Sequence, residues 1–580
     1  MRHLFWLFLC LAFCLPVMAV QPIPGLPATV NGGKPVTIVI DRFYPKTKIR
    51  NVSDKAEAAI RKAFQTRYPN VALQPFTFST KARITRGESF IDTNIRESMA
   101  EGKAPDVLTV NFRQTGTYIR KGYIRPLDEY ISQWRQTPAG EKEFDYFYSP
   151  PILKDVCFQS GPDGNMHWYT LPPHLRMVVV LSRLKDKLRA AGVDAEHPPK
   201  DWNEFYDQCL KVCDPRPQKD IYAYSLNDCW FLTHMLWSAG SEIVGEKAGK
   251  LALLYNDDAA VRAFQFAWVL QRGPWTICAD CGTHFSLLPK TLHFAVPTLA
   301  LPDRNDPGNR VYDLSDINLP LDRHLSYTCP RCHRKGTVGQ LRDKRMYFEG
   351  VCSDDVDNKY WNDKIIFRIS YLGETTLYMG TLYPAKIGLS RMPTDPVTHQ
   401  SRSEINSTLY AINGTSTNPA IIAAAWAYIR FRTSDEAERI LTKVYVENGC
   451  ASYLNPAMVR RCGYDASSRA VPSDLLSMLN GALQDGRPEP YAPDMQQLFN
   501  EMDKAWLAIR DLKSPDPAAI KKILDSNVEQ VSAQLLTPPP RQHNRRYYLA
   551  VTLGGIGLIL VLLASAFVVK RRVKSGDEAG

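Results

Sequence analysis

Two Cys-x-x-Cys pairs are the clearest chemical signal in the sequence. They are Cys278-Ala-Asp-Cys281 and, after a 47-residue spacer, Cys329-Pro-Arg-Cys332. Four thiolates at the corners of a tetrahedron form a common structural Zn²⁺ site, and a tight turn at each pair aims backbone N–H groups at the sulfurs. Since cysteine fills every position, no open position remains for a catalytic water. The sequence therefore predicts a closed structural zinc site, with no catalytic cofactor.

Disulfides are the alternative for these cysteines, because the chain carries signs of export. A disulfide inside Cys-x-x-Cys is more often a redox device than a structural link, which favours zinc. The pairs and the small or polar residues after them resemble the knuckles of a zinc ribbon, and we expect a zinc-ribbon-like insertion over residues 274–345. Seven further cysteines of the mature chain cannot all pair with one another. Cys450 and Cys462, which bracket a short loop, are the first candidates for a disulfide.

The first residues have the pattern of a secretory signal peptide. Arg2 and His3 precede an apolar run over residues 4–15, and small residues precede position 20. The run is too short to be a stable membrane span. We expect cleavage after residue 19 and a mature chain that works outside the cytoplasm.

A second apolar stretch lies near the other end of the chain. Residues 549–569 contain no charge, and as a helix they would cover about 32 Å, the thickness of a hydrocarbon core. Basic residues follow directly, which suits the cytoplasmic side. We expect a linker over 536–547, one transmembrane helix over 548–569 and a cytoplasmic tail over 570–580. The predicted location is the inner membrane, single-pass, with the body in the periplasm.

The net charge of +11 carries little information about partners. Half of the excess lies in the basic residues near the predicted membrane segments, and residues 20–540 hold 63 basic and 58 acidic residues. A net charge of +5 on a body of this size gives no case for nucleic-acid binding.

Strands and helices are expected to alternate along the first part of the body. Residues 36–40 and 71–78 read as strands, and a third strand is expected over 105–110. The segments between them, 54–67 and 91–99, have helical patterns. This order predicts an α/β fold with a parallel sheet, and about 520 residues suggest two or more lobes.

Ligands of open parallel sheets sit in a crevice at the carboxyl ends of the strands. Two polar segments follow predicted strands, Asp41-Arg42-Phe43-Tyr44 and Asn111-Phe112-Arg113-Gln114. The sequence therefore predicts that these segments face a ligand.

An ordered series of short segments extends these indications. The series includes Arg67-Tyr-Pro-Asn-Val71, Gly102-Lys-Ala-Pro-Asp-Val107, Gly122-Tyr-Ile-Arg-Pro-Leu-Asp128, Pro198-Pro-Lys-Asp-Trp-Asn-Glu-Phe205 and Asn413-Gly-Thr-Ser-Thr-Asn-Pro419. In this order they resemble the extracellular solute-binding proteins of ABC importers (family 1), the group that includes the maltodextrin receptors. The resemblance covers about residues 36–270 and 350–535.

The resemblance implies a type II periplasmic-binding-protein fold with two hinged α/β lobes. We place lobe one at 36–177 and 386–432, and lobe two at 178–385 and 433–535, with the insertion inside lobe two. Such lobes close on a solute like a clamp. The implied function is capture of a small solute, here a carbohydrate, and delivery to the membrane subunits of an ABC importer.

Receptors for sugars combine flat aromatic rings with polar hydrogen-bonding groups. For each candidate the alternative is a packing or solvated loop residue. The segments that match the cleft of the family hold twelve predicted ligand-binding residues: Asp41, Arg42, Tyr44, Asn111, Arg113, His174, Arg176, Asn227, Asp228, Trp230, Tyr378 and Tyr383.

Two other classes of function remain open at this point. A sensor or scaffold would signal to a membrane partner, but the short predicted tail carries no output domain. An exported glycan-active enzyme would need two converging carboxylates, which the sequence neither shows nor excludes. The sequence has no nucleophile elbow, phosphate loop or zinc-protease motif. We therefore expect a receptor and not an enzyme.

Overall fold

The structure is a computed structural model of the whole chain. It describes residues 22–41, 51–79, 90–148, 151–172, 177–216, 219–226, 229–287, 326–343, 346–353, 363–372, 386–407, 409–469 and 473–536. The chain divides into two units, Met1–Glu529 and Gln530–Gly580, and only the first residues of the second unit are described.

The first sheet has the strand order β19-β3-β1-β2. Strands β1 (Val36–Ile40), β2 (Val71–Pro75) and β3 (Val107–Val110) are parallel, and β19 (Leu409–Ile412) joins antiparallel to β3. The three parallel strands match the three predicted ones. The strand β19 comes from a part of the chain some 300 residues later, so a distant segment completes this sheet.

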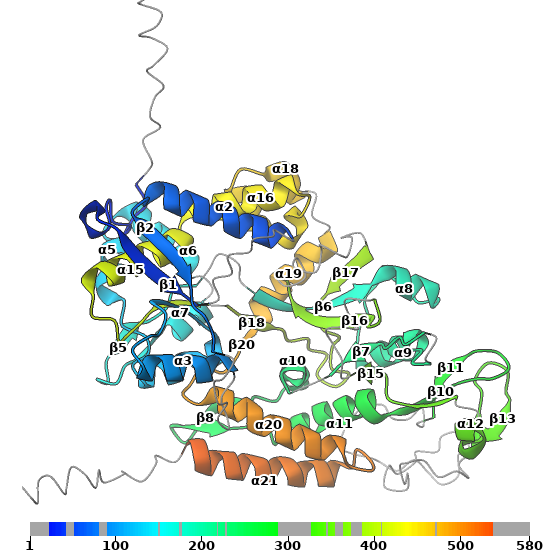
Figure 1. Cartoon of the computed structure of the whole chain (residues 1–580). Coiled ribbons are helices and arrows are strands. Elements are labelled where there is room, and N and C mark those ends of the chain that lie inside the picture. Colours follow the sequence, from blue (N-terminus) through cyan, green and yellow to red (C-terminus); the bar gives the residue numbers. More distant parts are fainter. Residues whose placement is uncertain are drawn as a thin grey trace, which may run out of the picture. The chain divides into compact units, whose positions relative to one another are not determined.

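Helices cover both faces of the first sheet (Figure 1). One core cluster joins the sheet to α2 (Val52–Arg67), α15 (Pro419–Arg432) and α16 (Asp435–Glu447). A second cluster joins it to α3 (Phe90–Ala100) and α4 (Phe112–Arg120). The predicted helices 54–67 and 91–99 are confirmed. Strands and helices alternate here because each helix buries its apolar face against the sheet.

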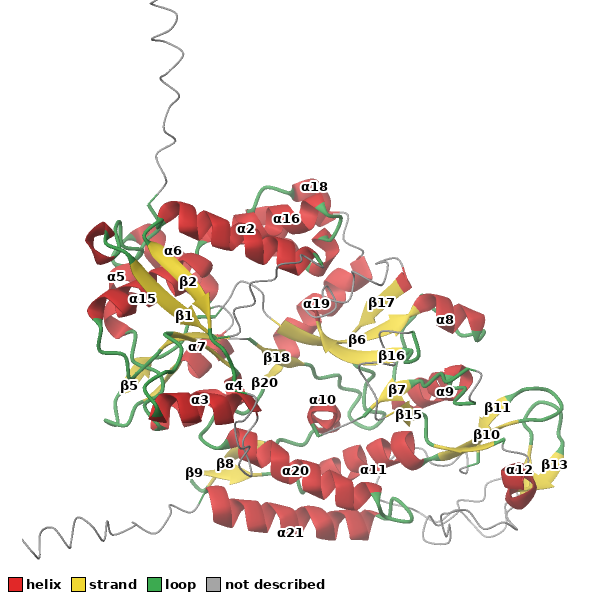
Figure 2. Ribbon diagram, in the orientation of Figure 1, coloured by secondary structure: helices red, strands yellow, loops and turns green. Residues whose placement is uncertain are grey.

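The second sheet has the strand order β16-β6-β18-β20, with β17 also paired to β6 (Figure 2). The long strand β6 (Met177–Leu184) is its centre. Its partners are β16 (Phe367–Tyr371), β17 (Ile387–Ser390) and β18 (Glu404–Asn406), and β20 (Arg487–Pro488) pairs with β18.

The predicted lobe boundaries at 386 and 433 differ from these contacts. Strand β17 and strand β18 pair in the sheet of β6, although both were expected in lobe one. Helix α16 was expected in lobe two, but it shares a core with α2. The membership of β17 and β18 is decided by their pairing with β6, and that of α16 by its packing against α2.

Helices α9 (Trp202–Val212) and α10 (Trp230–Ala239) contact β16 through the ring pairs Phe205–Phe367 and Trp230–Tyr371. Helix α11 (Asp258–Arg272) packs against α10 and against α20 (Met495–Arg510), and α21 (Pro517–Leu535) follows α20 in the chain. A small sheet has the order β11-β10-β14, formed by β10 (Pro274–Ile277), β11 (His284–Ser286) and β14 (Tyr347–Glu349). The hairpin of β12 (Ser326–Thr328) and β13 (Lys335–Thr337) precedes α12 (Val338–Asp343). The other elements are η1 (Asn31–Gly33), α5 (Asp128–Arg135), α6 (Pro138–Phe147), α7 (Pro151–Cys157), β4 (Phe158–Ser160), β5 (Met166–Trp168), α8 (Lys185–Ala190), β7 (Tyr224–Ser225), β8 (Val244–Lys247), β9 (Lys250–Leu253), β15 (Cys352–Ser353), η4 (Ala451–Tyr453), α17 (Pro456–Arg461), α18 (Asp465–Arg469) and α19 (Ser473–Asp485).

A buried ion pair connects α15 to α6, beside the first sheet. Arg430 pairs with Glu143, and Trp134 donates its indole N–H to Glu143 Oε2 at 2.9 Å. The Arg430 guanidinium lies 3.9 Å from the centroid of the Trp134 ring. All three side chains are buried, and we call them the Glu143 cluster.

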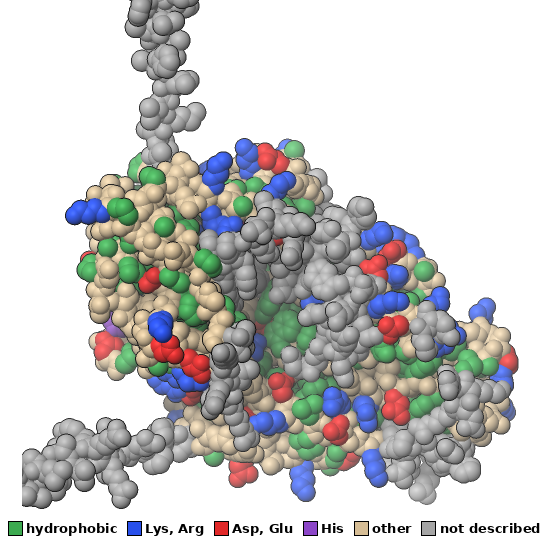
Figure 3. All heavy atoms as spheres, in the orientation of Figure 1, with side chains coloured by type: hydrophobic (Ala, Val, Ile, Leu, Met, Phe, Trp, Pro, Cys, Tyr) green, Lys and Arg blue, Asp and Glu red, His purple; other side chains and the backbone are tan. Residues whose placement is uncertain are grey.

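The predicted signal peptide (1–19) and transmembrane helix (548–569) both lie outside the described residues. Within the residues that the structure describes, none of the helices has the length and apolarity to cross a membrane. On the face drawn in Figure 3, acidic and basic side chains are interspersed, in agreement with the small net charge of the body.

Candidate functional site

Four of the twelve predicted ligand-binding residues lie in described parts of the chain: Asp41, Asn111, Arg113 and Trp230. The other eight lie outside the described residues: Arg42, Tyr44, His174, Arg176, Asn227, Asp228, Tyr378 and Tyr383. For those eight the sequence-based prediction stands untested.

Asp41 lies directly after β1, as predicted, but its carboxylate faces the protein interior. The residue is buried, and its Oδ1 accepts hydrogen bonds from the backbone N–H of Thr109 at 2.7 Å and from the Thr109 hydroxyl at 2.6 Å. Since Thr109 is in β3, these bonds tie the carboxyl end of β1 to the neighbouring strand. The contacts describe a structural role for Asp41.

Asn111 begins α4. Its side-chain oxygen accepts a hydrogen bond from the backbone N–H of Arg113 at 3.2 Å. In turn, the backbone N–H of Asn111 donates to the side-chain oxygen of Gln114 at 3.0 Å. This reciprocal cap satisfies donors that have no partner within the helix. It also starts α4 where β3 ends, so that Arg113 lies in the first turn.

Arg113 connects the region of the first sheet to that of the second. Its guanidinium forms an ion pair with Glu489, which follows β20. It also lies 4.3 Å from the centroid of the Phe499 ring in α20. A cation over an aromatic face is attracted by the ring electrons. The predicted cleft residue therefore holds contacts with two segments of the second region.

Trp230 joins the same group through a second carboxylate. Its indole N–H donates to Glu404 Oε2 at 2.7 Å. The hydroxyl of Tyr371, at the end of β16, donates to Glu404 Oε1 at 2.5 Å. Asn406 Nδ2 donates to Glu404 Oε1 at 2.8 Å and to Glu489 Oε2 at 2.9 Å, and thereby links the two carboxylates.

The local structure of β18 explains this arrangement. Side chains two residues apart in a strand point to the same face, so Glu404 and Asn406 lie side by side. We call the six residues together the Glu404 cluster: Arg113, Trp230, Tyr371, Glu404, Asn406 and Glu489.

The charges within the Glu404 cluster are unequal, because two carboxylates face one guanidinium. Burial, and then the charge of Glu489, raise the pKa of Glu404 to about 7, although hydrogen bonds from Tyr371 and Asn406 and the charge of Arg113 act against this. Burial also raises the pKa of Tyr371 well above its ordinary value. For Arg113, burial alone would lower the pKa, but the attraction of Glu489 raises it.

Sequence reasoning did not identify Tyr371, Glu404, Asn406 and Glu489. The only local signal was the alternation of polar residues around Ile405, and such alternation normally predicts a solvent-facing strand side. Here the polar side is buried, with Glu404 at 1% exposure and Glu489 and Asn406 at 0%. Only the pairing of β18 with β6 and β20 decides this.

The four cysteines of the predicted metal site come together. Cys278 Sγ lies 3.5 Å from Cys332 Sγ, and Cys281 Sγ lies 3.6 Å from Cys329 Sγ. All four sulfurs lie within 4.8 Å of one another. A tetrahedron with Zn–S bonds of about 2.3 Å has S···S edges of roughly 3.8 Å, whereas a disulfide needs about 2.05 Å. The spacing therefore fits a four-thiolate metal site and not two disulfides.

Both cysteine pairs have the same backbone turn. The N–H of Gly282 donates to the carbonyl of Cys278 at 2.9 Å, and the N–H of His333 donates to that of Cys329 at 3.0 Å. Gly282 and His333 each have positive φ, 68° and 57°. Each of these left-handed residues lies four positions after the first cysteine of its pair. The two turns are therefore alike, as expected for the two knuckles of a zinc ribbon.

The expected disulfide between Cys450 and Cys462 is wrong, because both are free thiols. Cys450 Sγ is directed to the carbonyl of Asn448 at 3.3 Å, and Cys462 Sγ lies 4.0 Å from Glu438 Oε1. The intervening 3-10 helix and α17 give each thiol a different neighbour.

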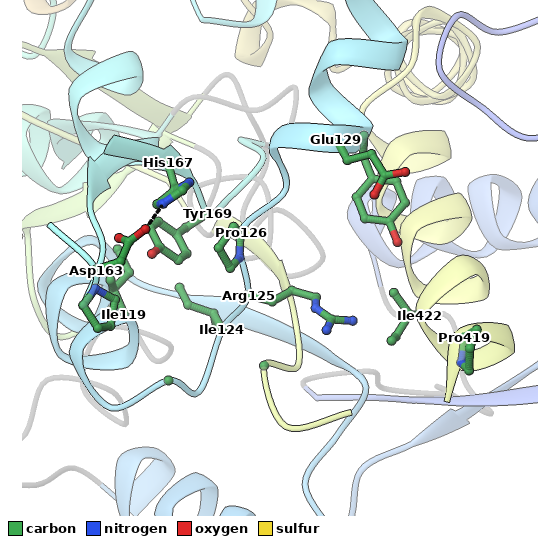
Figure 4. Close-up of a pocket in the computed structure, with 14 residues that line it drawn as sticks. Ile119, Ile124, Arg125, Pro126, Glu129, Asp163, His167, Tyr169, Pro419 and Ile422 are labelled. Atoms are coloured by element: carbon green, nitrogen blue, oxygen red, sulfur yellow. Dashed lines mark hydrogen bonds and ion pairs between the residues drawn. The ribbon is translucent and has the colours of Figure 1, made fainter. Parts of the chain in front are cut away.

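A separate pocket of about 730 Å³ lies against the first sheet's region (Figure 4). Its lining includes Arg125, Tyr169 and His167, which faces Asp163 at 3.0 Å. The neighbouring residue Asn413 donates to the carbonyl of Pro105, just before β3. The pocket is therefore at the edge where β3 begins, opposite to the edge that holds Arg113. None of the predicted ligand-binding residues that the structure describes lines it.

Residues 51–272 match the family model of the bacterial extracellular solute-binding proteins. The chain has no significant match among curated protein sequences.

Solved structures match the chain over most of its length. A solute-binding protein of an ABC transporter from Thermotoga lettingae, bound to α-D-tagatose, is 16% identical with a TM-score of 0.54, and the match covers 86% of this chain and 99% of that one. The maltodextrin-binding domain MalE of Bdellovibrio bacteriovorus, bound to maltotriose, is 15% identical with a TM-score of 0.54 and the same coverage. UgpB of Mycobacterium tuberculosis, in complex with glycerophosphocholine, is 12% identical with a TM-score of 0.53, again covering 86% and 99%.

These matches confirm the predicted two-lobed α/β fold. The chain has the two-lobed α/β fold of the solute-binding proteins of ABC transporters, and its residues 51–272 carry the sequence pattern of the bacterial extracellular solute-binding protein family.

Proposed function

We propose that this protein is an extracytoplasmic receptor that captures a carbohydrate between its two lobes and delivers it to the membrane subunits of an ABC importer. The observation that carries the proposal is the Glu404 cluster. In it Arg113, from the region of the first sheet, is connected through Glu489, Asn406 and Glu404 to Trp230 and Tyr371. Arg113, Trp230 and Tyr371 are only partly buried. The family match over residues 51–272 supports the same function, and it supports a binding protein rather than an enzyme.

The chemistry of the partly buried side chains supports a carbohydrate as solute. Sugar rings have apolar faces that pack on aromatic rings, and their hydroxyls need several hydrogen-bonding groups. The rings of Trp230 and Tyr371 lie 5.5 Å apart, centroid to centroid, at 47°. The guanidinium of Arg113 adds fixed donors beside them. Because proteins of this fold also bind glycerophosphocholine, the fold alone does not select the solute.

A direct test is calorimetric titration of the purified full chain with tagatose, maltotriose and glycerophosphocholine, combined with small-angle scattering. We expect one of the two sugars to bind and to reduce the radius of gyration, because lobe closure compacts the chain. Trp230→Ala should weaken that binding, whereas Trp426→Phe, in the core of α15, should leave it unchanged. Binding of glycerophosphocholine alone would contradict the carbohydrate assignment, and unchanged scattering with every solute would contradict capture by closure.

We propose, in addition, that the chain is exported by its first 19 residues and anchored by the apolar stretch over 549–569. The basic residues after that stretch support a cytoplasmic tail. Fractionation of cells that produce the full chain should find it in the inner membrane. A chain ending at residue 547 should appear in the soluble periplasmic fraction. Equal fractions for both chains would contradict the anchor.

We also propose that Cys278, Cys281, Cys329 and Cys332 hold a structural Zn²⁺. The S···S spacing and the paired turns support this, and the metal would join the β10–β11 hairpin to the β12–β13 hairpin. Elemental analysis of the purified full chain should find one zinc per chain. Cys332→Ser should lose it, and Cys450→Ser, a control thiol, should keep it. If the chain contains no zinc and these four cysteines react with a thiol reagent only after reduction, the result favours disulfides instead.

A further inference from the structure

The donors and acceptors of the Glu404 cluster differ in exposure. Three of the four side chains that donate to the carboxylates, Arg113, Trp230 and Tyr371, are partly exposed, and the fourth, Asn406, is buried. Glu404 and Glu489, which accept, are at 1% and 0% exposure. A solute that reaches this cluster therefore meets the side chains of Arg113, Trp230 and Tyr371, while the carboxylates lie behind them.

Glu404 determines where two of these donors lie. The terminal torsion of a Trp side chain has broad energy wells, and a hydrogen bond at the indole N–H, which lies off the torsion axis, restricts it. The Tyr hydroxyl lies on that axis, so a hydrogen bond there fixes the position of the far end of the ring. One oxygen of Glu404 holds the Trp230 indole N–H, and the other holds the Tyr371 hydroxyl. A single carboxylate thereby sets the relative pose of both rings.

Glu489 restrains the third donor in the same way, through its ion pair with Arg113. The amide of Asn406 donates to both carboxylates and holds them in one arrangement. Asn406 is fully buried, so water does not compete for these bonds. The inner layer is a connected network that supports every polar side chain of the outer layer.

We propose that Glu404 and Glu489 are positioning residues, which do not contact the solute but set the binding pose of Trp230, Tyr371 and Arg113. This inference rests on the proposed function, because the pose matters for a solute that binds against those side chains. It adds two residues, from β18 and from the segment after β20, that sequence reasoning did not identify.

The unequal charge of the network makes the positioning sensitive to pH. Among the described residues, the groups that act on Glu404 are Trp230 of α10, Tyr371 of β16, Asn406 of β18, Glu489 and Arg113 of α4, and Arg113 is the cation in this set. A proton taken up by Glu404 removes the excess negative charge and replaces one acceptor site by a donor. The pKa of about 7 for Glu404 is consistent with this exchange near neutral pH.

The first experiment is calorimetric titration of maltotriose into the purified full chain between pH 5.5 and 8.5. We expect Glu404→Ala to weaken binding about tenfold or more at pH 8, and Glu404→Gln to weaken it less. The wild type should change its affinity with a midpoint near neutral pH, and Glu404→Gln should not. The matched control is Glu143→Gln, which alters a buried carboxylate that also accepts from a Trp indole and an Arg. It should lose stability without losing affinity.

The second experiment reads the ring pose without any solute. In the full chain labelled with ¹⁵N in its tryptophan indoles, Trp230→Phe identifies the Trp230 signal. That signal should shift in Glu404→Gln and move with pH in the wild type, but stay in place in Glu143→Gln.

Two results would overturn the positioning role: wild-type affinity of Glu404→Ala for maltotriose, or an unmoved Trp230 signal in Glu404→Gln. If the wild type binds tagatose and not maltotriose, the same titrations are made with tagatose. If it binds neither sugar, that result counts against the carbohydrate proposal, and the indole signal alone decides the positioning role.

Discussion

The Glu143 cluster and the Glu404 cluster use the same side-chain types. In each, a buried glutamate accepts from a tryptophan indole N–H, at 2.9 Å from Trp134 and at 2.7 Å from Trp230. Each also contains an arginine paired with a buried glutamate and placed over an aromatic ring.

The two clusters differ in charge balance and in exposure. Glu143 and Arg430 form one pair of opposite charges, and Trp134 and Arg430 are both at 0% exposure. In the other cluster two carboxylates face one guanidinium, and Arg113, Trp230 and Tyr371 are partly exposed. In a closed and balanced pair each charge needs the other, because removing one partner leaves a buried charge unpaired. An unbalanced cluster with partly exposed side chains can still bind a ligand or take up a proton. The same residue types thus have different roles because of what surrounds them.

The largest expected effect is on the balanced cluster. Glu143→Ala should lower the free energy of unfolding by about 3–5 kcal/mol, because it leaves Arg430 buried without a counter-charge. Urea unfolding monitored by circular dichroism measures this. The double variant Glu143→Leu with Arg430→Met should recover most of the loss, since no charge then remains buried. A single variant as stable as the wild type would remove the basis for calling this cluster structural.

The Glu404 cluster should make the free energy of unfolding depend on pH. The pKa of Glu404 is about 7 in the folded chain against an ordinary 4.5, so the folded state binds the proton more tightly than the unfolded state. Its contribution to stability is complete below about pH 4.5 and is lost as the pH rises to about 7. The loss is at most roughly 3 kcal/mol. Other carboxylates have opposite trends, so the quantity to measure is the difference between wild type and Glu404→Gln.

Urea midpoints of both chains at pH 4.5, 6 and 7.5 give that difference. We expect Glu404→Gln to gain stability relative to wild type as the pH rises over this range. A constant difference would mean that Glu404 titrates near its ordinary value, and that the two clusters are electrostatically alike.

The smallest expected effects come from substituting the two tryptophans whose indoles donate to the buried glutamates. Trp134→Phe and Trp230→Phe each remove one hydrogen bond to a carboxylate, with a cost on the order of 1 kcal/mol. The fully buried Trp134 should show this cost in the free energy of unfolding. Trp230, which is partly exposed, should show it mainly in the affinity for maltotriose. Unfolding and titration of both variants give the comparison, and equal effects on both quantities would argue against a division of roles.

Several features of the fold follow from local sequence. The apolar run over 36–40 and the helical pattern over 54–67 became β1 and α2, because strand and helix periodicity act over a few residues. The strand-then-helix order placed Arg113 in the first turn of α4, beside the end of β3. Each cysteine turn is also local, as the matching φ angles of Gly282 and His333 show.

Other features depend on segments that are far apart in the chain. Trp230 and Glu404 are separated by 174 positions, and no pattern around either residue indicates the other. Asp41 and Asn111 follow strands as predicted, yet their side chains are used by neighbouring backbone. The loop position was predictable, but the direction of the side chain was not.

The sequence alone determined the fold class, the order of the first strands and helices, the two cysteine turns and the presence of Arg113 and Trp230 among the candidate residues. Only the tertiary structure decided that β17 and β18 pair with β6, that Glu404 and Glu489 are buried, and that the four sulfurs meet across the spacer. The physical reason is that periodicity and turn chemistry are local, whereas burial and charge pairing depend on which distant segments the folded chain brings together.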